Sequence, residues 1–199
     1  MLLSDSFGLV AGVLMALSSI VYFMQVFNGK SEPNPVSWGI WFFVSIINSF
    51  TYFTVVNHNV WQALFAITNS FAIFTILTYT LLKGVHSKIR QTDLLVVLLT
   101  IVVSIFWQIT SSDRFANLLL QAIYVISYIP TISGVLSKNA KEHYMAWLIT
   151  VIASLFATLS VLTNYPGDWV SIVNPLIIGV ICNSLVLVLI LTRRKITSH

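Results

Sequence analysis

The sequence predicts an all-α membrane protein of seven transmembrane helices, and three observations lead to this fold class. Of the 199 residues, 57% are hydrophobic and only 8% are charged, and the mean hydropathy is +0.91. A soluble core of this size could not bury so much apolar surface. The apolar residues fall into seven runs, each close to the roughly 20 residues that cross a hydrocarbon core. Charged residues lie at the ends of these runs or between them.

The runs place the expected helices in order. They lie at about 7–27, 37–56, 60–82, 93–110, 115–136, 145–163 and 169–192. The breaks between them are short and polar, so none can form a separate domain. The first run has no basic flank before it and no small-residue cleavage site after it, which favours a retained helix over a signal peptide.

An internal repeat organises the runs. The stretch from Tyr22 to Val55 matches the stretch from Tyr128 to Val161 without a gap, at a constant offset of 106 (128 minus 22). The identical pairs are Tyr22 and Tyr128, Ser31 and Ser137, Trp41 and Trp147, Ile46 and Ile152, Phe50 and Phe156, and Val55 and Val161. We therefore expect two three-helix units, in residues 1–83 and 114–199, joined by a single linker helix within 84–113. A single linker makes the two units parallel across the membrane.

Basic residues give the orientation. If the helix ends are counted alternately, Arg114 alone falls on one side and the other nine basic residues fall on the opposite side. These nine are Lys30, Lys83, Lys88, Arg90, Lys138, Lys141, Arg193, Arg194 and Lys195. The positive-inside rule then places the N-terminus outside and the C-terminus in the cytoplasm. The net charge of +4 reflects this topology and indicates no nucleic-acid partner. The short termini favour a plasma membrane, of the bacterial inner-membrane type.

Apart from Asp93, at the very start of the fourth span, the expected spans contain no charged residue and no histidine. Proton relays and ion pathways depend on such residues, and membrane hydrolases and metalloenzymes need paired carboxylates or histidines. A retinal protein would need a lysine within the last helix, but the nearest, Lys195, lies beyond it. The single cysteine, Cys182, excludes an internal disulfide. We therefore expect no enzyme activity, no metal and no cofactor.

Neutral polar and aromatic residues form stripes at three- and four-residue spacing, so each stripe lies on one helix face. The stripes comprise Trp38, Trp41, Ser45, Asn48 and Tyr52; Tyr144, Trp147, Ser154 and Thr158; Asn117, Gln121, Tyr124 and Tyr128; and Ser18, Tyr22 and Gln25. They predict an interior of uncharged hydrogen-bonding groups and aromatic faces. Such an interior suits a neutral polar solute, because it can replace hydration without the desolvation cost of an ion.

Short motifs add a resemblance to a known family. The sequences Tyr22-Phe23-Met24-Gln25 and Tyr128-Ile129-Pro130-Thr131, with Asn69 and Asn174, resemble the SWEET and PQ-loop superfamily over nearly the whole chain. The resemblance implies two three-helix bundles around a central pocket, an asparagine pair that contacts substrate, and prolines that support rocking between outward-open and inward-open states. Asn69 and Asn174 match the asparagine pair, and Pro130 matches one motif proline.

The chain also departs from that pattern. Met24 replaces the proline of the first proline-glutamine pair, and Thr131 replaces the glutamine of the second. Tyr52 and Thr158 lie about where sugar-transporting members have pocket tryptophans, which leaves open whether the solute is a sugar. The segment from Pro33 to Trp41 is similar to a signature of uncharacterised bacterial SWEET-like proteins. Nicotinamide riboside transporters share the seven-helix plan, so a ring-containing solute is also open.

These observations together predict a transporter that moves a small neutral polar solute, such as a sugar, nucleoside or vitamin, by alternating access. Facilitated diffusion is favoured because the spans carry no carboxylate. The expected substrate contacts are Asn69, Asn174, Asn48, Tyr52, Ser154, Thr158, Gln121 and Tyr124. The expected gate or hinge residues are Trp41, Trp147, Tyr22, Tyr128, Gln25 and Pro130.

Other interpretations remain open at this stage. Tryptophans near a helix end can anchor it at the membrane interface, and membrane asparagines can simply bond a neighbouring helix. Asn183 stands opposite Asn174 on an ideal helix and is expected to be structural. The same fold could also serve as a receptor or sorting factor, as the KDEL receptor does in this superfamily, or as a subunit without a ligand. A monomer and a homo-oligomer are both possible.

Overall fold

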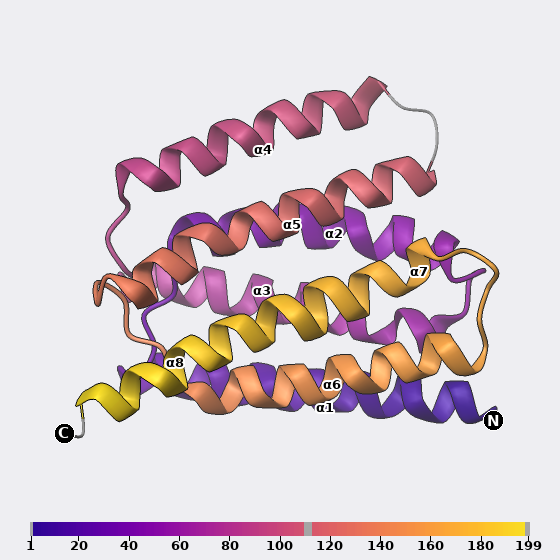
Figure 1. Cartoon of the computed structure of the whole chain (residues 1–199), viewed down its shortest axis with the longest axis horizontal. Helices are drawn as coiled ribbons and strands as arrows, with labels where there is room; N and C mark the ends of the chain where they lie inside the picture. The colour runs from indigo at the N-terminus through magenta and orange to yellow at the C-terminus, as the bar shows by residue number, and fades with distance from the viewer. Residues whose placement is uncertain (1, 110–112, 198–199) are drawn as a thin grey trace.

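The structure is a computed structural model that describes residues 2–109 and 113–197. The side chains of Arg114, Arg194 and Lys195 lie outside the described part. Three consecutive segments, α7, η1 and α8, form one continuous final helix (Figure 1). The helices are α1 (Leu3–Phe27), α2 (Pro35–Val55), α3 (Val60–Lys83), α4 (Gln91–Ile109), α5 (Asp113–Leu136), α6 (Tyr144–Thr163), α7 (Val170–Val173), η1 (Asn174–Cys182) and α8 (Asn183–Thr197).

The described residues confirm an all-helical fold and six of the seven predicted membrane spans. They form seven helices and no strand, and the helix bounds differ from those expected by only a few residues. Among them, α1, α2, α3, α5, α6 and the final helix are long and apolar enough to cross a membrane. Large apolar side chains such as Phe50 and Phe71 point outward and are 75% and 71% exposed. The chain is therefore a multi-pass integral membrane protein.

Local chemistry explains where the helices begin and end. The side-chain oxygen of Asn34 accepts hydrogen bonds from the backbone N–H groups of Val36 and Ser37, and Pro35 occupies the first position of α2. Asparagine at the cap and proline just after it are typical of a helix start. Gly84 ends α3 in the left-handed conformation, with φ of 65°. Glycine adopts this conformation without a steric penalty.

The helices pack as two groups of three with α4 outside them. We call α1–α3 the first triplet and α5–α8 the second triplet. Within the first triplet, α3 packs against both α1 and α2; within the second, the final helix packs against both α5 and α6. The triplets meet where α1 lies along α6 and where α2 lies along α5, while α4 packs against α5 and α2 at the outer edge (Figure 1).

One end of the bundle carries the basic residues. We call it the basic end: it includes the end of α1, the α3–α4 and α5–α6 connections and the end of α8, with Lys30, Lys83, Lys88, Arg90, Lys138, Lys141 and Arg193. In Figure 1 it is the end where the C-terminus lies.

A glycine in α1 sets how closely two helices approach. A Cβ on Gly8 would overlap the backbone carbonyl of Trp61, whereas a Cβ on Gly39 in α2 would meet no atom within 4 Å. We expect Gly8→Ala to cost about 1–3 kcal/mol of unfolding free energy, because α1 must shift away from α3. Gly39→Ala should leave stability unchanged or raise it slightly. Thermal unfolding in detergent measures both, and equal melting temperatures for the two variants would contradict this packing.

Candidate functional site

A cavity of about 80 Å³ lies between the two triplets. Its volume holds several water molecules, since one water needs about 10–15 Å³ on this measure. No charged side chain of the described residues lines it. Eight residues expected to act in substrate binding or gating do line it: Asn48, Asn69, Tyr124, Asn174, Tyr22, Trp41, Tyr128 and Trp147.

The other four expected substrate contacts lie outside the lining, and three of them bond nearby backbone. The Tyr52 hydroxyl donates to the Ser171 carbonyl at 2.7 Å. The Ser154 and Thr158 hydroxyls donate to backbone carbonyls one turn earlier in α6, at 2.7 and 2.8 Å. The position of a residue on a helix face predicts where its side chain points but not which group it hydrogen-bonds. These three side chains are therefore already satisfied without a solute.

The fourth, Gln121, belongs to a buried amide network that joins the two triplets. Its Nε2 donates to Asn48 Oδ1 at 2.7 Å, and the same oxygen accepts from Asn117 Nδ2 at 3.1 Å. Its Oε1 accepts from Asn174 Nδ2 at 3.1 Å. Asn48 and Asn174 thus reach the cavity with side chains that the network holds in place.

Three polar groups at the cavity have no hydrogen-bond partner among the described residues: the side chain of Asn69 and the indole N–H groups of Trp38 and Trp41. Among the described residues, none forms a hydrogen bond with the side chain of Asn69, which is half-buried and lines the cavity. The indole N–H of Trp41 is buried, with the side chain 6% exposed, and no described residue accepts its hydrogen bond. An unsatisfied buried donor costs about 1–3 kcal/mol. A ligand that carries an acceptor would remove that cost.

Asn183 also lines the cavity, and the expectation that it stands opposite Asn174 is wrong. Between them the chain forms a π-helix, whose i→i+5 bonds take more residues per turn than an α-helix. The wider turn brings the two asparagines to the same face. Asn183 Nδ2 donates to the carbonyls of Ile178 and Gly179 at 3.1 and 2.8 Å, and its Oδ1 accepts from the Tyr128 hydroxyl at 3.0 Å.

Pro175 leaves a backbone carbonyl to which the Tyr52 hydroxyl donates. Proline has no N–H, so an α-helical bond to the carbonyl four residues earlier, Ser171, cannot form, and the Tyr52 hydroxyl donates to that carbonyl instead. We expect Tyr52→Phe to lower the unfolding free energy by about 1–3 kcal/mol, because it leaves a buried carbonyl unpaired. Ligand affinity, measured by calorimetry once a ligand is known, should stay the same. A variant with wild-type stability and weakened binding would place Tyr52 in the site after all.

An aromatic cluster closes the cavity toward the basic end. It consists of Tyr22, Trp38, Trp41, Tyr128 and Trp147, with neighbouring ring centroids 4.8–6.5 Å apart. The three tryptophans are only 6–7% exposed. They therefore pack inside the protein and do not anchor helices at the membrane interface.

Residues that match in the repeat make matching contacts. Tyr22 meets Trp147 across α1 and α6, and Tyr128 meets Trp41 across α5 and α2. Closer to the basic end, Gln25 Nε2 bonds His143 Nδ1 at 3.1 Å, and the Thr131 hydroxyl donates to that of Ser37 at 3.0 Å. The partners in each pair of contacts differ by 106 positions. We call the Gln25 contact the α1–α6 latch and the Thr131 contact the α2–α5 latch.

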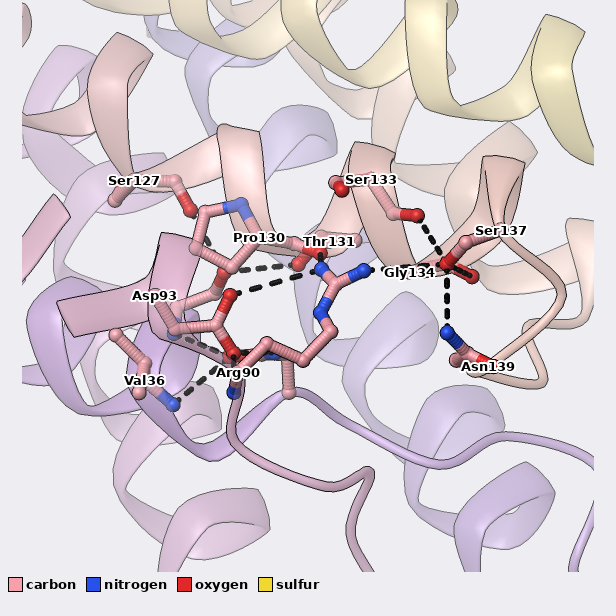
Figure 2. Close-up of polar contacts among 12 residues, drawn as sticks. Val36, Arg90, Asp93, Ser127, Pro130, Thr131, Ser133, Gly134, Ser137 and Asn139 are labelled. Atoms are coloured by element: carbon pink, nitrogen blue, oxygen red, sulfur yellow. Dashed lines mark hydrogen bonds and ion pairs between the residues drawn. The ribbon is translucent and has the colours of Figure 1, made fainter. Parts of the chain in front are cut away.

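The linker helix is tied to both triplets beside the α2–α5 latch (Figure 2). Asp93 is fully buried and accepts from Asn34 Nδ2 at 3.2 Å and from the backbone N–H of Arg90 at 2.9 Å. The Arg90 guanidinium lies 3.6 Å from Asp93 and donates to the carbonyl of Pro130 and the hydroxyl of Ser137 at 3.0 and 3.1 Å. Pro130 thus lies at this junction, away from the cavity.

Glu142 lies beside the α1–α6 latch. It was not among the expected site residues, because the sequence places it in a loop. Its Oε1 accepts from the Tyr22 hydroxyl at 2.8 Å and its Oε2 from Trp147 Nε1 at 3.2 Å. Burial raises the pKa of this carboxyl to about 7, although both hydrogen bonds act in the opposite direction. A titratable group therefore touches the aromatic cluster.

No family model, curated protein or solved structure matches the chain. The fold and the site define a class: a multi-pass membrane protein with an uncharged cavity between two packed helix triplets. Function must therefore be argued from the site itself.

Proposed function

We propose that the protein is a transporter that moves a small neutral polar solute by alternating access, with the first triplet rocking against the second. The observation that carries the proposal is the cavity between the triplets, which no described charged side chain lines and where Asn69 and Trp41 present unpartnered polar groups. An unpaired buried donor is unfavourable in an empty site and favourable in an occupied one.

The lining indicates the chemistry of the solute. The Trp41 N–H requires an acceptor oxygen or nitrogen, and the carboxamide of Asn69 can pair with a hydroxyl, a carbonyl or an amide. The aromatic rings offer faces for a sugar ring or a base. Sugars, nucleosides and vitamin-like molecules meet these requirements. An ion does not, because no described group in the lining compensates its charge.

The triplets are bridged on both sides of the cavity, which fits an occluded state. The latches lie on the basic side. At the opposite end, Gln62 Nε2 donates to the carbonyls of Ser160 and Asn164 at 3.1 and 2.9 Å, and the Ser160 hydroxyl donates to the Ser4 carbonyl at 2.6 Å. Alternating access requires one set of bridges to break while the other holds. The basic end faces the cytoplasm by the positive-inside rule, and the uncharged lining favours facilitated diffusion.

Binding and exchange assays test the proposal in sequence. The purified protein is screened for a rise in melting temperature with neutral sugars, nucleosides and vitamins, because a ligand of the folded state raises its stability. A labelled hit is then followed across sealed proteoliposomes. A transporter exchanges the label, whereas binding without exchange would indicate a receptor, and no binding at all would contradict the proposal.

A further inference from the structure

The carboxyl of Glu142 is wedged between the two helices that meet at the α1–α6 latch. Tyr22 contacts it from α1 and Trp147 from α6, each through a neutral donor. Both donors belong to the aromatic cluster that closes the cavity. Glu142 is half-buried, and any movement of α1 away from α6 breaks at least one of the two hydrogen bonds and exposes the carboxyl to more water.

We infer that Glu142 is a proton-binding site that controls the cytoplasmic gate: proton binding holds α1 closed against α6, and proton release opens them. The inference takes the cytoplasmic placement of this end from the proposed function. The proton passes from the carboxyl to cytoplasmic water and back, and it is not the cargo.

The sign follows from the two environments of the carboxyl. In the closed gate, burial raises its pKa to about 7; in an open gate, water would return it to the ordinary value of about 4.3. The closed state therefore binds the proton more tightly, so acid favours closing. As the pH rises through about 7, the closed state loses this advantage and the gate opens.

Charged groups surround Glu142 on several elements. Glu32, on the α1–α2 connection, acts to raise its pKa, and Lys141 pairs with Glu32 at 2.8 Å. His143 bonds Gln25. Lys30 and, from α8, Arg193 line a second cavity, of about 320 Å³, together with Glu142 and Lys141. This cavity gives protons a route from the basic end to the carboxyl.

Only one of the two matching positions in the repeat holds a titratable residue. The position that matches Glu142, 106 residues earlier, is Val36, which cannot titrate. Correspondingly, Trp147 donates to a carboxylate, whereas the matching Trp41 has no acceptor among the described residues. The α2–α5 latch consists of the hydroxyls of Ser37 and Thr131. Glu142 therefore acts on the α1–α6 seam and has no counterpart at the matching position of the α2–α5 seam.

Cysteine labelling tests the gate without any solute. In a Cys182→Ser background, Ala146→Cys places a thiol in the lining of the cavity that the aromatic cluster closes. A membrane-impermeant maleimide is added to sealed vesicles that expose the basic end, and the labelling rate is divided by that of exposed Lys88→Cys at the same end. The reference corrects for vesicle orientation and for the pH dependence of the thiol. The ratio is expected to rise by about tenfold between pH 6 and pH 8.

Variants assign the effect to one carboxyl. Glu142→Gln, which resembles the protonated form, should give a low ratio at every pH. Tyr22→Phe removes a hydrogen bond that lowers the pKa of Glu142, so it should move the rise to higher pH and provides a second check if Glu142→Gln folds poorly. The matched control Glu32→Gln should keep the rise and move it to lower pH.

A constant ratio from pH 6 to pH 8 in the parent protein would overturn the inference, as would an unchanged rise in Glu142→Gln. Both results concern gating alone. Failure of the proposed function would appear separately, as the absence of solute exchange in proteoliposomes whose gate still responds to pH.

Discussion

A disulfide between Ser18→Cys and Thr150→Cys is expected to stop solute exchange almost completely. The two hydroxyl oxygens lie 2.7 Å apart across α1 and α6, so the cysteine sulfurs can approach bonding distance without a large backbone movement. The bond would join the triplets beside the cavity. Since alternating access needs α1 and α6 to separate, the oxidised protein should be fixed with this side closed.

The chain offers a matched control for this cross-link. The hydroxyls of Ser49 and Ser70 lie 2.8 Å apart, but both belong to the first triplet. In a Cys182→Ser background, an oxidised 49–70 pair should leave exchange near the level of its reduced form, and reductant should restore exchange to the 18–150 pair. Exchange is measured in proteoliposomes before and after reduction. Unimpeded exchange by the oxidised 18–150 pair would rule out rocking of the triplets.

Asn69→Ala is expected to weaken ligand binding by about tenfold while the melting temperature of the free protein stays close to wild type. One neutral hydrogen bond contributes about 0.5–1.5 kcal/mol, and 1.4 kcal/mol corresponds to a factor of ten in affinity. The stability should not change, because no described residue forms a hydrogen bond with this side chain. Calorimetric titration and thermal unfolding measure the two quantities.

Asn48→Ala is the contrasting variant. Asn48 also lines the cavity, but its side-chain oxygen accepts from both Gln121 and Asn117. Its removal takes one acceptor from each of two buried amides, whose N–H groups keep only Thr51 Oγ1 at 3.1 Å and Asn117 Oδ1 at 3.3 Å, so a loss of about 1–3 kcal/mol is expected even without ligand. If Asn69→Ala were the more destabilising of the two, Asn69 would have a structural role and the argument for a ligand contact would fail.

The sequence predicted the membrane class and the seven helices because apolar run length and polar breaks are local properties. It also predicted Tyr22, Trp41, Tyr128 and Trp147 as gate or hinge residues, since each belongs to a stripe on one face of its helix. The cavity lining contains all four, with Asn69 and Asn174. Helical periodicity was sufficient for this group, because each residue lies on the inward face of its helix.

The remaining features depend on partners that are distant in sequence. The π-helix that brings Asn183 to the cavity changes the periodicity on which a helical-face argument relies. Tyr52 and Gln121 have the expected orientation toward the interior but are satisfied by Ser171 and by other amides. Glu142 lies in a loop, and the packing of α1 against α6 leaves it half-buried, with its carboxyl bonded to Tyr22. The hydrogen-bond partners of such side chains cannot be predicted from the spacing of residues along one helix.

The two latches differ: a glutamate lies beside the α1–α6 latch, whereas the matching position beside the α2–α5 latch is a valine. If the triplets were separate copies of one chain in a homodimer, the interface would be isologous and every substitution would enter both seams at once. A carboxyl introduced at one seam would be duplicated at the other. Covalent linkage through α4 removes that constraint, so position 142 can hold glutamate while position 36 holds valine. A single polypeptide can thus carry a glutamate at one seam and an apolar residue at the matching position of the other, which two identical subunits cannot do.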